Sequence, residues 1–303
     1  MMADQARRLR ELAQEKVGSP ARGKATSGGN RGRICRSIAV TSGKGGVGKS
    51  NVSLSLAVAL SQMRKKTLLF DADLGLANIH ILLGLAPKHN LLHVVNGACS
   101  IEDALCAGPE GVTILPGSSG IAAMADLERY RLEELQRKLS RIEESYDFMI
   151  IDGGAGIGKN TMLMSSSAGT ALLVLTPEPT ALADVYATAK VLVSMGVTDL
   201  QVLVNMAGNE REGREIFEKL RGLVRNFLRR EIRLSGIIPF DRDVPKMVRM
   251  QRNPMQSKPS SRFAAGIQGY ARALCGTSPG RVGFFDRLLA GIGKGSPDGE
   301  NEL

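Results

Sequence analysis

The stretch that decides the fold is residues 36–53, RSIAVTSGKGGVGKSNVS. Its β-branched and small residues at 37–41 predict a buried strand, and a helical pattern begins after Gly48. The residues between them match the spacing G-x-x-x-x-G-K-S at positions 43–50. In such a loop, backbone N–H groups turn inward around phosphate oxygens at a helix N-terminus. The pattern therefore predicts a phosphate-binding loop between a strand and a helix.

Two residues of this loop carry chemistry beyond the backbone. We expect Lys49 to contact the β- and γ-phosphates of a nucleoside triphosphate and the Ser50 hydroxyl to bind Mg²⁺. The nucleotide-binding residues predicted in this segment are Gly43, Lys44, Gly45, Gly46, Val47, Gly48, Lys49, Ser50 and Asn51.

The same glycines also satisfy the dinucleotide fingerprint G-x-G-x-x-G, and Asp71 lies near the distance expected for a ribose-binding acid. Three features favour the triphosphate: the pair Lys49 and Ser50, the additional Lys44 inside the loop, and a strand-end carboxylate at Asp152. A third alternative is that the loop is only a flexible glycine-rich turn that binds no ligand. That alternative does not explain why Lys44 and Lys49 are present.

Composition limits the classes of protein that this chain can be. It has 303 residues, 43% of them hydrophobic, with no apolar run of membrane-spanning length and no apolar segment of a secretory signal. The four cysteines show no CxxC spacing, which predicts a reducing cytoplasm and no metal cluster. The net charge of +10 is concentrated in residues 1–36 and 209–303. These basic ends suit nucleic acid, anionic lipid or an acidic partner.

Beyond the loop, apolar runs alternate with helical patterns, which predicts an α/β fold. The near-continuous apolar character of the runs indicates a doubly wound, mostly parallel sheet of the P-loop NTPase type with helices on both faces. The predicted strands are 38–41, 67–70, 112–115, 148–151, 171–175, 202–204 and 234–238, and the predicted helices include 50–63, 127–144, 181–195 and 211–229. Ligands on such sheets bind at the carboxyl ends of the strands.

Carboxylates follow two of these strands. Asp71 and Asp73 end the second strand, and at this spacing both can face one phosphate, although a plain Asp- and Gly-rich turn is the alternative. Asp152 ends the strand 148–151 in a Walker B arrangement, which predicts a direct or water-mediated Mg²⁺ ligand. The glycine-rich turn after Asp152 is predicted to be a switch that senses the γ-phosphate.

Both ends of the chain carry amphipathic patterns. Residues 4–17 predict a short helix capped by Asp4, and residues 18–36 predict a flexible basic linker. That helix is expected either to dock back or to enter the groove of a partner. In the tail, 276–303, a helix at about 282–292 has an apolar face and flanking basic residues, which resembles an interfacial membrane anchor. A helix docked over the core is the alternative.

The segment KGGVGKS at 44–50 resembles the deviant Walker A box of the MinD/ParA ATPases, and the resemblance extends over 37–275. It implies a slow ATPase that binds ATP with Mg²⁺ and works as a homodimer. In this family the extra lysine, here Lys44, reaches the phosphates of the partner subunit, so Lys44, Lys49 and Asp73 become the catalytic residues. The departure from the family pattern is Gly153–Gly154, where relatives usually carry Ser/Thr-Pro.

The resemblance also assigns individual positions. Asp73 orients or activates the attacking water, Asp71 lies nearer the metal with Ser50 and Asp152, and Asp184 meets the signature lysine. The residues expected to flank adenine are Asn205, Pro239, Phe240 and Asp241. An Asn that follows a strand is also a common turn former, so the role of Asn205 in binding the base stays open.

Residues 4–10, 71–84, 155–158 and 205–207 further resemble the FlhG/FleN flagellar regulators. This implies control of flagellar number and placement, with an FlhF-type GTPase contacted through Asp4–Arg10, a flagellar transcription activator and C-ring proteins as partners. It also implies a cytoplasmic protein at the inner face of the plasma membrane, attached to anionic lipid through the tail. A ParA-type partition ATPase with nonspecific DNA on 211–262, a MinD-type division-site regulator and a nucleotide-binding module without turnover are the alternatives.

Overall fold

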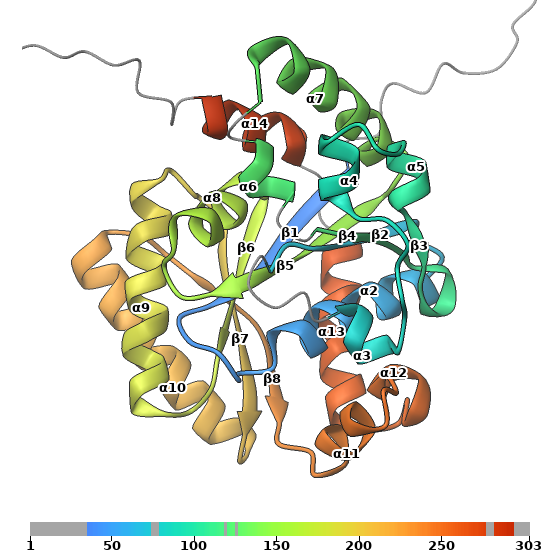
Figure 1. Cartoon of the computed structure of the whole chain (residues 1–303). Helices are drawn as coiled ribbons and strands as arrows, with labels where there is room; N and C mark the ends of the chain where they lie inside the picture. The colour runs from blue at the N-terminus through green and yellow to red at the C-terminus, as the bar shows by residue number, and fades with distance from the viewer. Residues whose placement is uncertain (1–34, 74–78, 118–119, 125–126, 277–281, 294–303) are drawn as a thin grey trace, which may run out of the picture. The chain divides into compact units, whose positions relative to one another are not determined.

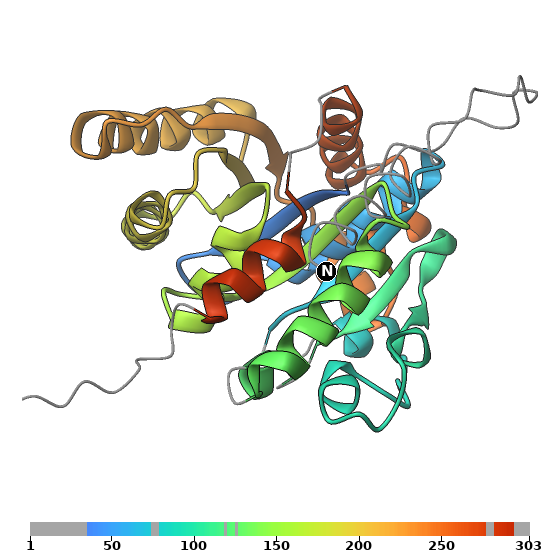
Figure 2. The same cartoon turned by 90° about the horizontal axis from the view of Figure 1, so that it is seen from above.

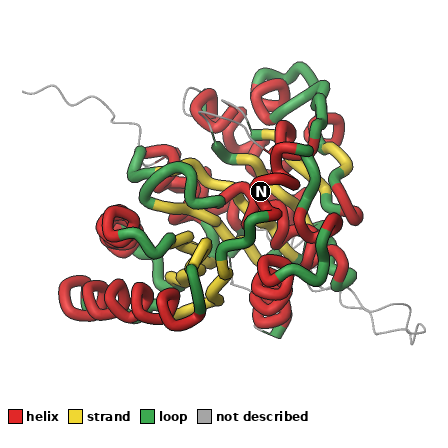
Figure 3. The backbone as a smooth tube through the Cα atoms, turned by 90° about the horizontal axis from the view of Figure 1, so that it is seen from below, coloured by secondary structure: helices red, strands yellow, loops and turns green. Residues whose placement is uncertain are grey.

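The computed structural model describes residues 35–73, 79–117, 120–124, 127–276 and 282–293, which all belong to one unit of the chain, 33–303. The predicted N-terminal helix at 4–17 and all but the last residues of the predicted linker lie outside the described residues. Figure 3 shows the strands of this unit in its interior with helices around them.

The centre of the unit is an eight-stranded sheet in the order β3-β4-β2-β5-β1-β6-β7-β8. Its strands are β1 (Arg36–Ser42), β2 (Thr67–Asp71), β3 (Cys106–Ala107), β4 (Thr113–Pro116), β5 (Phe148–Ala155), β6 (Thr170–Leu175), β7 (Leu200–Ala207) and β8 (Arg233–Pro239). All neighbouring pairs are parallel except β3 and β4. The predicted α/β fold class and the seven predicted strands are confirmed. The sequence analysis missed β3, because two residues on a sheet edge carry no periodic signal.

Helices cover both faces of the sheet because side chains alternate along its buried strands. Ile38 and Val40 face one core with α2 (Lys49–Gln62) and α13 (Arg262–Cys275), whereas Ala39 faces the other. The second face is covered by α7 (Arg129–Glu143), α8 (Lys159–Ser167), α9 (Pro179–Ser194), α10 (Glu210–Leu223) and α14 (Phe284–Gly293). Figure 1 shows α9 and α10 across the sheet from α2 and α13.

Short helices fill the connections, and one long predicted helix is interrupted. The short helices are α3 (Ile79–Leu83), α4 (Leu91–Val95), α5 (Ile101–Ala104), α6 (Gly120–Met124), α11 (Asp243–Arg249) and α12 (Pro254–Ser257), with a 3₁₀ turn, η1, at Pro109–Gly111. The predicted helix 211–229 becomes α10 followed by a π-helical turn, η2 (Val224–Leu228), which ends where Arg229 adopts a left-handed conformation (φ 54°). A left-handed residue cannot continue a right-handed helix, so the element ends there.

The tail helix lies in the core, which agrees with the alternative of a docked helix and differs from an exposed membrane anchor. Phe284, Phe285, Leu288 and Leu289 of α14 are buried, and both Phe rings contact Phe70 of β2. Figure 2 shows α14 beside α7. The Glu143 carboxylate at the end of α7 accepts hydrogen bonds from the first two N–H groups of α14 (2.7 and 3.1 Å). In this conformation the apolar face of α14 is part of the hydrophobic core.

Among the described residues, no helix has the length and the apolar content that crossing a bilayer requires.

Candidate functional site

The loop between β1 and α2 has the backbone geometry of a phosphate cradle. Gly46 and Gly48 adopt left-handed conformations (φ 81° and 88°), and Gly48 is the N-terminal cap of α2. A Cβ atom on Gly43 would lie 2.2 Å from the backbone carbonyl carbon of Asp184 in α9, which no side chain allows. These glycines let the loop turn tightly and present its N–H groups at the N-terminus of α2.

Lys49 is buried at the base of this loop, with only 8% of the residue exposed. Burial lowers the pKa of its ammonium group, while the nearby carboxylates of Asp152 and Asp73 raise it. A buried cation at a helix N-terminus attracts anions, so the position suits the phosphate contact that the motif predicts.

Asp71 and Asp152 form a buried carboxylate pair at the ends of adjacent strands. They are register partners in the β2–β5 ladder and are 1% and 0% exposed. Burial raises the pKa of Asp71 to about 7, with the charge of Asp152 adding to the shift. Burial likewise raises the pKa of Asp152 to about 6, and the hydroxyls of Ser50 and Ser53 lower it in part.

One oxygen on each of these carboxylates, Asp71 Oδ1 and Asp152 Oδ2, is buried and has no hydrogen-bond partner among the described residues. Two such oxygens beside the Ser50 hydroxyl form a hard-oxygen donor set that suits Mg²⁺, which takes one or two carboxylates together with nucleotide phosphates. The residues present therefore fit the predicted metal, with Ser50, Asp71 and Asp152 as the groups that would hold it.

Ser53 is a member of this site that the sequence analysis missed. Its hydroxyl lies one helical turn after Lys49 and donates to Asp152 Oδ1 at 2.8 Å. The available signal was the spacing, because residues four apart share one face of a helix. This hydrogen bond orients the Asp152 carboxylate while leaving Oδ2 for another partner.

Asp73 lies against the glycine turn that follows Asp152. A Cβ atom on Gly154 would come within 3.6 Å of Asp73 Oδ1 and 3.0 Å of Thr161 Oγ1. A side chain at 154 would therefore crowd the Thr161 hydroxyl, whereas the Asp73 carboxylate would be in ordinary van der Waals contact with it. The turn is completed by Gly156, which has φ 83° and donates its N–H to the Ser42 carbonyl at 2.9 Å. Glycine at 154 therefore accommodates the Thr161 hydroxyl beside the turn.

The Lys44 side chain forms an ion pair with Glu178, at the start of α9. It also lies 3.4 Å from Thr180 Oγ1. The sequence analysis did not identify Glu178, because nothing local connects residues so far apart in the chain. Asp184, the predicted counterpart of Lys44, packs its backbone against Gly43. Its contact with a lysine of a second subunit stays a prediction.

The residues predicted to flank the base come together beside the loop. A shallow pocket is lined by Gly48, Asn51, Asn205, Met206, Pro239, Phe240, Asp241, Val244, Pro245 and Phe263. Phe240 is 54% exposed, so its ring is accessible to a flat ligand. The Asn205 amide donates to the Val47 carbonyl at 2.9 Å. Asn205 therefore positions the phosphate loop in this structure, a role that the sequence did not predict.

Comparison with known proteins agrees with this geometry. A family model described as the CobQ/CobB/MinD/ParA nucleotide binding domain matches residues 38–254. The chain belongs to this family. The predicted MinD/ParA resemblance is confirmed. Membership of this family argues against the alternative that the glycine loop is a dinucleotide-binding fingerprint.

The chain is similar along most of its length to named members of the family. It is 40% identical over 266 residues to the antiactivator FleN of Pseudomonas aeruginosa, which covers 86% of this chain and 95% of FleN. It is 32% identical to the flagellum site-determining protein YlxH of Helicobacter pylori, over 84% and 90% of the two chains.

Solved structures of MinD proteins are similar to this chain in fold. MinD in the MinC:MinD complex of Aquifex aeolicus superposes with a TM-score of 0.66 at 28% identity, over 82% of this chain and 99% of that one. The Mg-ADP complex of MinD from Pyrococcus horikoshii superposes with a TM-score of 0.64 at 26% identity, over 80% and 96%.

Proposed function

We propose that this chain is an ATP- and Mg²⁺-dependent ATPase that pairs with a second copy of itself and regulates flagellar number and placement. The flagellar assignment is supported by the similarity to FleN and YlxH, which each span at least 84% of this chain. The cofactor assignment is supported by the phosphate cradle, the unpartnered carboxylate oxygens and the Mg-ADP bound by a MinD relative.

The observation that carries the dimerisation proposal is the position of Lys44. Its ammonium group forms an ion pair with Glu178, at the start of the helix α9 that packs against Gly43 of the phosphate loop. Because a phosphoryl transition state needs cationic charge on its oxygens, a lysine supplied by a second copy would make hydrolysis depend on pairing. The exposed Ile157, beside the same loop, gives apolar surface for such a contact.

Within each nucleotide site, different residues of this chain have different roles. Lys49 binds the β- and γ-phosphates, Asn205 and Val47 hold the loop, and Phe240 covers the base. Asp73, whose carboxylate lies beside the turn at Gly154, orients the attacking water. Bound Mg²⁺ would neutralise charge on the phosphate oxygens, and the Asp71–Asp152 pair would hold it.

Membrane attachment through α14 then requires a change of conformation. The face that suits lipid is buried against β2 and α7, so we propose that pairing with ATP releases α14 toward anionic lipid at the inner face of the plasma membrane. Two released helices per dimer would bind far better than one. The FlhF-type GTPase, reached through Asp4–Arg10, the transcription activator and the C-ring proteins remain the proposed partners.

The DNA-partition alternative has less support from surface charge. On α10, which falls in the segment predicted to contact DNA, Arg211, Arg214 and Arg221 each pair with a glutamate of the same helix at 2.8–3.2 Å. Paired arginines offer less net charge to phosphates, on which nonspecific DNA binding depends.

The direct test of pairing is Lys44→Ala. We expect this variant to bind ATP but to lose ATP-dependent dimerisation in sedimentation and to lose phosphate release. Lys190→Ala, at an exposed position of α9, should behave like the wild type. Asp73→Ala should instead accumulate as the ATP dimer. Unchanged ATP turnover in Lys44→Ala would contradict the proposal that the lysine of a second copy acts in hydrolysis.

The flagellar role has its own test. In Pseudomonas aeruginosa lacking FleN, expression of this chain should restore the normal number of flagella, and Lys44→Ala should not. A chain that hydrolyses ATP as a dimer but never changes flagellar number would retain the enzymatic proposal and contradict the flagellar one.

A further inference from the structure

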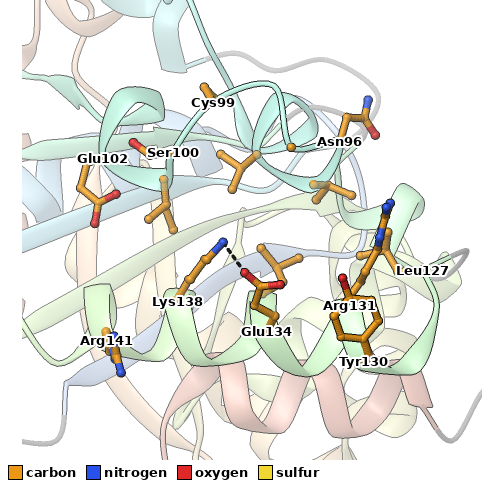
Figure 4. Close-up of a pocket in the computed structure, with 15 residues that line it drawn as sticks. Asn96, Cys99, Ser100, Glu102, Leu127, Tyr130, Arg131, Glu134, Lys138 and Arg141 are labelled. Carbon is orange, nitrogen blue, oxygen red and sulfur yellow. Dashed lines mark ion pairs between the residues drawn. The ribbon is translucent and has the colours of Figure 1, made fainter.

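A groove of about 640 Å³ lies between α4–α5 and α7, on the side of α7 away from α14 (Figure 4). Its base is apolar and is formed by Val94 and Val95 of α4, Ile101 of α5 and Leu135 of α7. Neither the nucleotide site nor the contacts of α14 use it. The groove is therefore available while α14 is docked.

The α7 wall of the groove carries a regular row of charged side chains. Arg131, Glu134, Lys138 and Arg141 follow each other at spacings of three and four residues, which places them on one face of the helix. In Figure 4 the central two form an ion pair, Lys138 Nζ to Glu134 Oε1 at 2.8 Å. The central charges therefore neutralise each other.

The two arginines that end the row differ from this central pair. Arg131 and Arg141 are both exposed, and no ion pair within the described part of the chain includes either of them. They are ten residues apart on α7, or about 15 Å along the helix. The opposite wall adds one carboxylate, Glu102, so the lining as a whole carries a net positive charge.

We propose that this groove binds an acidic amphipathic helix of a partner protein. Apolar side chains of the bound helix would lie over Val95, Ile101 and Leu135, as in other helix-in-groove complexes. Carboxylates about three turns apart on the bound helix would reach Arg131 and Arg141. A cation at each end and an apolar base between them favour such a segment over nucleic acid, because phosphates would meet the neutralised Lys138–Glu134 pair at the centre.

The test uses a fluorescent 14-residue alanine-rich peptide with glutamates at its second and thirteenth positions and leucines at its sixth and ninth. We expect saturable binding to the full-length protein in anisotropy titrations at physiological salt. The double variant Arg131→Glu with Arg141→Glu should bind about tenfold more weakly, because charge reversal replaces attraction by repulsion. It should also bind a lysine version of the peptide more tightly than the wild type does.

The matched control reverses two arginines of α10, a helix that contributes no residue to the lining of the groove. Arg211 pairs with Glu215, and Arg214 pairs with Glu210. Reversing both changes the net charge of the protein by as much as the groove variant does, and it should leave peptide affinity unchanged. All four positions are exposed, so circular dichroism should report an intact fold for each variant.

Three outcomes would overturn the proposal: no saturable binding, equal loss in the control variant, or no gain for the lysine peptide. Concentration-dependent self-association that disappears in the Arg131→Glu, Arg141→Glu variant would assign the groove to a second copy of this chain instead. A duplex DNA oligonucleotide that binds more tightly than the peptide and competes with it would assign the groove to nucleic acid.

Discussion

The buried carboxylate pair makes the metal-free protein less stable than it could be, and Asp71→Asn tests this. Asparagine has the shape of aspartate and keeps an oxygen that can accept the Ile79 N–H, which donates to Asp71 Oδ2 at 3.1 Å. The substitution removes only the charge that burial and Asp152 disfavour. We therefore expect the free energy of unfolding to increase at alkaline pH.

The magnitude follows from the shift in pKa. Folding raises the pKa of Asp71 from 3.8 to about 7, and each pKa unit corresponds to about 1.4 kcal/mol. The native state therefore holds a proton that the unfolded state has released. Stability is lost as the pH rises from about 4 to about 7. Because Asp152 shares the titration, we expect Asp71→Asn to recover about 2–4 kcal/mol at pH 8 and less than half of that at pH 5.

The assay is urea unfolding of both proteins at pH 5 and pH 8 in the presence of a chelator. The stability difference between variant and wild type should grow by about 2 kcal/mol between the two pH values. Glu133→Gln, at an exposed carboxylate of α7, serves as the control and should show no such growth. Adding Mg²⁺ with ADP should stabilise the wild type more than Asp71→Asn. A difference that is independent of pH, or a variant that is less stable at pH 8, would refute the reasoning.

Three further substitutions test separate contacts. Glu178→Gln removes the ion pair that holds Lys44, and it should increase ATP-dependent dimerisation in sedimentation by up to about fivefold, since exposed ion pairs contribute about 0–1 kcal/mol. Phe240→Ala removes the exposed ring beside the base pocket and should weaken ATP binding in calorimetry by about tenfold, as expected for stacking. Leu288→Ala truncates a fully buried side chain of α14 and should lower the free energy of urea unfolding by about 2–5 kcal/mol.

Each of these has a result that would contradict it. Unchanged dimerisation in Glu178→Gln would mean that the ion pair does not restrain Lys44. Phe240→Ala should keep the stability of the wild type, so a loss of affinity together with unfolding would not support stacking. A change below about 0.5 kcal/mol in Leu288→Ala, the size of an ordinary surface substitution, would place α14 outside the core in solution.

The strands, the phosphate loop and the carboxylates could be predicted because their signals lie in contiguous residues. The apolar runs at 38–41 and 148–151 predict buried strands, and the glycines of 43–48 have a spacing that tight phosphate cradles share. Once the sheet is parallel, its topology carries the strand ends to one edge, so Asp71 and Asp152 become neighbours. Local pattern and one rule of topology were enough to place the phosphate loop and these two carboxylates at one edge of the sheet.

Only the tertiary structure decided which surface the amphipathic tail helix α14 covers and which distant groups pair. The apolar stripe of α14 has the same periodicity whether it meets lipid or the core, and the contacts of Phe284 and Phe285 with Phe70 are what distinguish the two. The pairing of Lys44 with Glu178 and the hydrogen bond from Asn205 to Val47 join residues more than 130 positions apart. Such contacts depend on how helices and loops pack in space. The spacing of residues along the chain does not show which distant side chains come into contact.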